Sequence, residues 1–181
     1  MNIFYLDSDP RIAAQAHCDK HVVKMILETA QLLSIAHRIL DGTEYIDASS
    51  GRKLRRWRMP DSDREELLYK ATHVNHPCAI WVRANYANYS WAFSLFAELS
   101  KEYTHRYGRS HLSFDKLEHL LVFTPDHITK SKECTDVPQA MPDEFKVPGD
   151  PVLAYRRYYL GSKAEIAVWN NNRNPPEWWL E

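Results

Sequence analysis

Polar side chains recur at helical spacing inside an otherwise apolar segment near the start of the chain. His21, Lys24, Glu28 and Gln31 fall at i, i+3, i+7 and i+10, and His17 extends the same line by one turn. Apolar residues surround this line between residues 19 and 40, a pattern typical of a buried helix. Buried charges are costly unless they pair, lose their charge or face a cavity. The stripe therefore predicts a polar pocket lined by a core helix.

Lys24 and Glu28 are the members of this stripe best suited to covalent chemistry. At i, i+4 they could form a simple ion pair, which stabilises a helix by only a few tenths of a kcal/mol. The stronger hypothesis is that Lys24 is a partly desolvated amine beside His21, able to attack a substrate or to form a Schiff base. Glu28 or His21 would then transfer protons.

Histidines offer a second kind of chemistry. His17 and His21 share a helix face and could chelate a transition metal such as zinc or iron, together with His73 and His76. No Glu stands at the position that a metalloprotease helix requires, and hydrogen-bonded core histidines are the simpler interpretation. His76 precedes Pro77 at an expected helix start, where it could face an anion or serve only as the helix cap.

A short basic run is the third candidate. Arg52, Lys53, Arg55, Arg56 and Arg58 surround Trp57, and such a pattern suits phosphate contacts combined with one stacked base. Lys20, on the stripe-bearing helix, is expected to add to this nucleic-acid contact. The alternative is an ordinary solvated loop. A non-catalytic module that binds nucleic acid or a protein partner through this run is also consistent with the sequence.

Composition and charge exclude several classes of function. The 181 residues carry a net charge of -1, so any anion site must be local. The three cysteines are odd in number and widely spaced, and the first residues lack the basic and apolar pattern of a signal peptide, which together predict a reduced, cytoplasmic setting. No segment has the length and apolarity of a membrane span. Serine-triad, phosphate-loop and dinucleotide motifs are absent from the sequence.

The sequence predicts that the segments which carry these residues are helices. We predict an all-α, single domain over residues 1–181, with a short extended amino-terminal segment and five or six helices around the stripe-bearing one. Asp9-Pro10 and Asp150-Pro151 are expected helix starts. The expected helices cover residues 9–40 with a joint at 18–19, 61–72, 78–107, 113–122 and 151–169. A basic loop at 43–62 and a proline-containing loop at 123–150 separate them.

Several segments carry a resemblance that spans nearly the whole chain. HCDKHVVKMILE (17–28), NHPCAIWVR (75–83), YTHRYG (103–108), PQAMP (138–142) and VPGDP (147–151) resemble a family of uncharacterised phage and bacterial proteins. This resemblance implies no particular activity.

A more remote similarity concerns the bacteriophage endonuclease-V-type pyrimidine-dimer DNA glycosylases, which are small, all-α and cytosolic. The shared features are the extended amino terminus, residues 13–17 opening a buried helix, His76 before an aromatic helix, and a carboxy-terminal part rich in Tyr and Trp. Those enzymes attack the damaged nucleotide with a free amino-terminal amine, helped by a Glu on the first helix.

This sequence departs from that pattern at both points. Asn2 is too bulky for efficient removal of the initiator Met, and Lys24 stands at the expected Glu position, with Glu28 one turn later. The similarity therefore implies a DNA glycosylase or lyase in which Lys24 replaces the terminal amine. The nucleotide would be flipped into a pocket lined by His17, His21, Lys24, Glu28 and His76. The expected partner is nucleic acid, DNA rather than RNA, and no cofactor is required.

Overall fold

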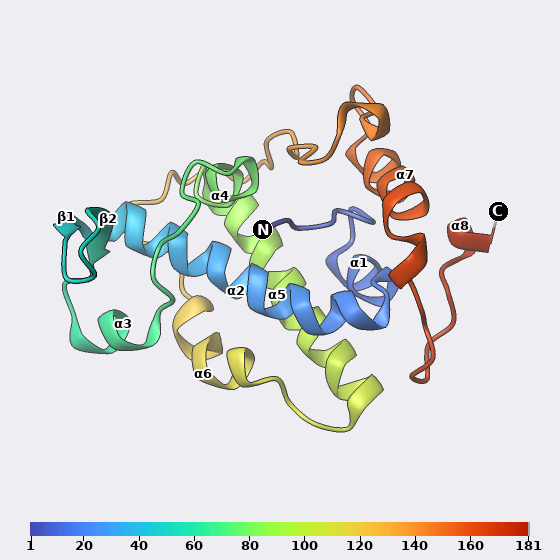
Figure 1. The fold of residues 1–181 in the computed structure, drawn as a ribbon, viewed down its shortest axis with the longest axis horizontal. Coiled ribbons are helices and arrows are strands. Elements are labelled where there is room, and N and C mark those ends of the chain that lie inside the picture. Colours follow the sequence, from blue (N-terminus) through green and yellow to red (C-terminus); the bar gives the residue numbers. More distant parts are fainter. Residues whose placement is uncertain (181) are drawn as a thin grey trace.

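The computed structural model describes residues 1–180, a helical protein with one small β-hairpin (Figure 1). The α-helices are α1 (Pro10–Ala16), α2 (Asp19–Asp41), α3 (Ser62–Leu67), α4 (Pro77–Val82), α5 (Tyr86–Tyr107), α6 (Leu112–Leu121), α7 (Pro151–Ser162) and α8 (Glu177–Leu180). Two 3-10 turns, η1 (Asp143–Phe145) and η2 (Ala164–Ile166), lie on either side of α7. The hairpin consists of β1 (Thr43–Asp47) and β2 (Leu54–Arg58). A mainly helical fold is thus confirmed.

Helices α2 and α5 cross at the centre of the molecule, and α1 also packs on α5 (Figure 1). Their contact faces are apolar and fully buried, with Met25, Ile26 and Leu33 on α2 and Leu95 and Phe96 on α5. Helix α2 is not buried on all sides, however. Val23 and Leu27 are 38% and 37% exposed, and Lys20 and Lys24 share this outer face. One side of the stripe-bearing helix therefore faces solvent.

Both long helical segments are interrupted, and a new helix starts after each break. The joint expected at residues 18–19 is present, because His17 and Cys18 are extended between α1 and α2. The single helix expected over 78–107 is wrong. The side chain of Asn85 accepts a hydrogen bond from the amide of Asn88 at 2.9 Å and caps a second helix there. The two breaks, with α8, raise the number of helices in the described residues to eight.

The basic segment at 43–62 is not an irregular loop. It begins with an antiparallel hairpin in which Tyr45 pairs with Arg56. The buried guanidinium of Arg38, near the end of α2, donates hydrogen bonds to the carbonyl oxygens of Trp57 and Leu68 at 2.8 Å. It also donates to the carboxylate of Glu65 at 2.7 Å. Hydrogen bonds from a buried, charged guanidinium are strong. Arg38 therefore fixes the hairpin and α3 against the end of α2.

The long loop expected at 123–150 is present, interrupted only by η1. It crosses the molecule from α6 to α7, which stands with α1 and α8 at the end opposite the hairpin (Figure 1). At that end Phe4, Tyr155 and Tyr159 form an aromatic core. None of the helices within residues 1–180 combines the length and apolar composition that crossing a membrane requires.

Candidate active site

The first two residues are held in place by an unusually well-bonded side chain. The Asn2 carboxamide oxygen accepts hydrogen bonds from the Tyr155 hydroxyl at 2.9 Å and, more weakly, from the Cys78 thiol at 3.7 Å. Its nitrogen donates to the carbonyl oxygen of Ala140 at 2.9 Å. Burial raises the pKa values of the Tyr155 hydroxyl and the Cys78 thiol, the latter to about 11, so both remain protonated donors. The amino-terminal segment is therefore pinned between α4, α7 and the 138–140 loop.

Glu28 is the acidic group that faces this pinned segment. Its Oε2 accepts a hydrogen bond from the Asn2 amide at 2.9 Å and lies 3.8 Å from the amino nitrogen of Met1. Its Oε1 lies 3.3 Å from the Nζ of Lys24, which confirms the i, i+4 pair. The Glu28 side chain is only 13% exposed, whereas that of Lys24 is 64% exposed. One half-enclosed carboxylate thus contacts two amines.

His76 stands beside the same group. It caps α4, and its Nδ1 accepts a hydrogen bond from the amide of Cys78 at 3.2 Å, so the neutral ring carries its proton on Nε2. Burial lowers the pKa of His76, and the amino group of Met1 and His73 lower it further, while Glu28 opposes them. The charges of Met1 and Glu28 therefore both act on the His76 ring. A neutral imidazole in this position can accept or deliver a proton.

His17 and His21 lie at the other end of the stripe, inside the aromatic core. His17 donates from Nδ1 to the carbonyl oxygen of Ala13 at 2.6 Å, and His21 shares a hydrogen bond with the Tyr159 hydroxyl. The ring of Phe4 packs on His21 with centroids 4.6 Å apart. Burial lowers the pKa of His17 to about 4 and that of His21 to about 3. Both are neutral core side chains, so the catalytic set predicted from the stripe does not assemble as one group.

A four-histidine metal centre does not form either. His73 and His76 lie together at the start of α4, whereas His17 and His21 lie against α7. Within residues 1–180, no three His, Cys, Asp or Glu side chains come close enough to hold one metal ion.

The basic hairpin presents fewer available cations than its sequence suggests. Arg55 makes two hydrogen bonds to Glu44, at 2.7 and 2.9 Å. Arg58 stacks over the Tyr45 ring at 4.9 Å, and Arg56 donates to the carbonyl oxygen of Ala71. Arg52 and Lys53, in the turn, and Lys20, on α2, are exposed and have no ion-pair partner among the described residues. Among the cations predicted to bind nucleic acid, these three have neither an ion pair nor a stacking partner in the described part of the chain.

Trp57 cannot stack on a base in this structure, contrary to the expectation from its basic neighbours. Its side chain is 7% exposed, and Arg55 covers its ring at 5.2 Å. Position 57 alternates with the exposed Arg58 in β2, so its side chain points to the buried face of the hairpin. Trp57 therefore contributes to the core and not to an aromatic binding surface.

Sequence reasoning missed the residues that pin the amino terminus. Asn2, Cys78, Ala140 and Tyr155 are far apart in the chain, and no local spacing connects them. The one available signal was the similarity to glycosylases that use an amino-terminal amine beside a helix Glu. Comparisons of the chain with models of protein families, with curated proteins and with solved structures gave no match.

Proposed function

We propose that the protein is a nucleic-acid-processing enzyme of the DNA glycosylase and abasic-site lyase type, with Glu28 at its reaction centre. The observation that supports this is the contact of one half-enclosed carboxylate with two amines, Lys24 and the amino group of Met1. Imine formation requires a nucleophilic amine and a group that transfers protons, and an amine beside a carboxylate provides both.

The proposed step takes place on the sugar of the target nucleotide. The amine lone pair attacks C1′, the bond from C1′ to the base breaks, and the base leaves with the electron pair. At a site that has already lost its base, the same amine adds to the C1′ aldehyde and water is lost, giving an imine. Removal of a C2′ proton from the imine and departure of the 3′ phosphate then cleave the strand. Glu28 accepts the amine proton, and we assign the second proton transfer to His76, whose pKa responds to both Met1 and Glu28.

Met1 is the amine that we favour over Lys24. The side chain of Met1 is 5% exposed, and its neighbour Asn2 is pinned by three side-chain contacts, so the amine is held in place. Lys24 is largely solvated and must lose freedom to react. The role of Lys24 as the nucleophile, predicted from the sequence, stays a prediction that the next experiment decides.

Borohydride trapping tests this proposal. Protein whose first residue is verified as Met1 by intact mass is mixed with an oligonucleotide that carries one abasic site, and borohydride is added. We expect a covalent adduct, because hydride reduces the imine to a stable secondary amine. Peptide mapping is expected to place the adduct on Met1, and Lys24→Ala is expected to retain it.

The control experiments distinguish Met1 from Lys24 as the reacting amine, and an enzyme from a binding module. An adduct that maps to Lys24 and disappears in Lys24→Ala would assign the amine to lysine and keep the enzyme class. Absence of an adduct with both proteins, under conditions where the chain binds the oligonucleotide, would contradict the enzyme class and leave a non-catalytic binding module. Lys101→Ala, which removes an exposed lysine from α5, serves as the matched control.

DNA binding is expected to depend on the turn of the hairpin. Replacing Arg52 and Lys53 by Gln removes two unpaired cations, so the slope of log affinity against log salt is expected to fall by about 1 to 2. The paired change Glu44→Gln with Arg55→Gln keeps the net charge and is expected to leave the slope nearly unchanged. Fluorescence anisotropy over a range of salt concentrations measures both. Equal slopes for the three proteins would place the phosphate contacts elsewhere.

A further inference from the structure

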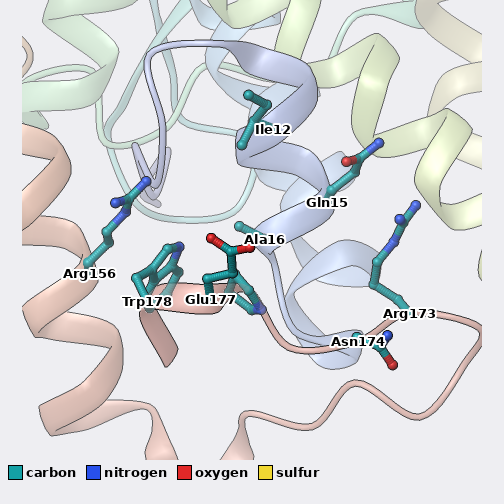
Figure 2. Close-up of a pocket in the computed structure, with 9 residues that line it drawn as sticks. Ile12, Gln15, Ala16, Arg156, Arg173, Asn174, Glu177 and Trp178 are labelled. Atoms are coloured by element: carbon teal, nitrogen blue, oxygen red, sulfur yellow. The ribbon is translucent and has the colours of Figure 1, made fainter. Parts of the chain in front are cut away.

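A pocket of about 560 Å³ opens at the end of the molecule opposite the hairpin. Its walls come from α1, from α7 and from the carboxy-terminal segment, as Figure 2 shows. Its volume lies within the range of small-molecule sites, and its lining is polar as well as apolar. None of the residues of the proposed active site lines it.

Two arginines on its wall are held rigidly by carboxylates behind them. Arg173 donates two hydrogen bonds to Glu102, at 2.7 and 2.6 Å. Arg156 donates to Asp7 and to the carbonyl oxygen of Leu6, each at 3.0 Å. In both guanidinium groups, Nη1 makes no hydrogen bond to the described residues. Each arginine therefore keeps a fixed donor for a further acceptor, such as a phosphate oxygen.

The carboxy-terminal segment places an aromatic ring beside Arg156 and an acceptor next to that ring. Arg156 stacks over the half-buried indole of Trp178 at 5.4 Å and so helps to fix its orientation. The carboxylate of Glu177 is turned toward α1 in Figure 2 and forms no ion pair with any residue from 1 to 180. The carboxamide of Gln15, across the pocket, also lacks a hydrogen-bond partner in that range. Two unused polar side chains, Glu177 and Gln15, thus line the same pocket as this aromatic ring.

We infer that this pocket binds a mononucleotide whose base carries an exocyclic amino group. The base would stack on Trp178, since base–aromatic stacking tolerates any base. Glu177 would accept a hydrogen bond from the amino group, as carboxylates do from cytosine N4. Gln15 would pair with the rest of the base edge, and Arg173, on the side of the pocket away from Trp178, would contact the phosphate. The inference goes beyond the amine chemistry proposed above and does not rest on it.

Isothermal titration of the full chain with dAMP, dCMP and dTMP tests this inference. Thymine has no exocyclic amino group, so dAMP and dCMP are expected to bind about tenfold more tightly than dTMP. Glu177→Gln is expected to remove this preference, because an amide both donates and accepts. Glu165→Gln, which changes an exposed glutamate outside the pocket, is expected to keep it. Deoxyadenosine, which lacks the phosphate, is expected to bind more weakly than dAMP.

Three results would overturn the inference: equal affinity for the three nucleotides, a preference that survives Glu177→Gln, or inorganic phosphate binding as tightly as dAMP. A single-stranded oligo-dA that binds more tightly than dAMP, with the same dependence on Glu177, would identify the ligand as a nucleotide within a strand. An oligo-dA that binds only as tightly as dAMP would identify the ligand as a free nucleotide. Because titration needs no turnover, its outcome is independent of borohydride trapping.

Discussion

Replacing Glu28 by Gln is expected to slow cleavage at an abasic site by about 100-fold or more, since positioned acid–base groups contribute factors of this size. A Gln side chain fills the same space and its oxygen can still accept the hydrogen bond from the Asn2 amide. The amide cannot take a proton from the attacking amine, nor can it hold the positive charge of Met1 and Lys24. The change therefore removes the chemistry and preserves the local geometry.

The measurement is the single-turnover rate of strand cleavage, with circular dichroism to verify the fold. Glu66→Gln, on the exposed face of α3, provides a matched control that is expected to keep the full rate. A Glu28→Gln protein that retains its rate within threefold would remove Glu28 from the mechanism. Loss of activity together with loss of helical signal would instead assign Glu28 a structural role and contradict its role as the proton carrier.

Local signals in the sequence predicted local structure well. Asp9 and Asp150 accept hydrogen bonds from the amides of Arg11 and Leu153, as their position before Pro suggested. His76 caps α4, and the spacing of Lys24 and Glu28 produced their contact. Each of these features depends on residues within four positions of one another, where chain geometry leaves few alternatives.

The predictions that the structure did not confirm concern residues whose partners lie far away in the sequence. The hairpin is fixed by Arg38, which lies 19 residues before Trp57. The burial of Trp57 therefore could not be inferred from its basic neighbours. The solvation of Lys24 was hidden because Val23 and Leu27, which share its face, are apolar and yet exposed. The polar stripe of α2 is accordingly divided, with His17 and His21 in the core and Glu28 at the amino terminus. Helical periodicity places residues on a face, but it does not say what covers that face.

Acid is expected to destabilise the fold strongly, because three histidines are buried in the neutral form. Burial lowers the pKa values of His17, His21 and His37 to about 4, 3 and 4, against an ordinary value of 6.5. For His37, the nearby Asp41 carboxylate only partly offsets burial, and Arg64 adds to it. Each ring is hydrogen-bonded within the folded protein, His37 to the Tyr89 hydroxyl at 2.9 Å. Protonation must then disrupt these buried arrangements.

The direction of the effect follows from proton uptake. Between pH 6.5 and about 4 the unfolded chain binds protons at these rings that the folded chain does not, so the free energy of unfolding falls as the pH falls. Each histidine is expected to contribute a loss of about 2 kcal/mol between pH 7 and pH 5. Denaturation with urea at the two pH values measures the total, and His37→Asn is expected to reduce it by about 2 kcal/mol. A free energy of unfolding that stays constant over this range would show that the rings bind protons equally in the folded and unfolded chains, and would contradict their neutral burial beside α7 and α5.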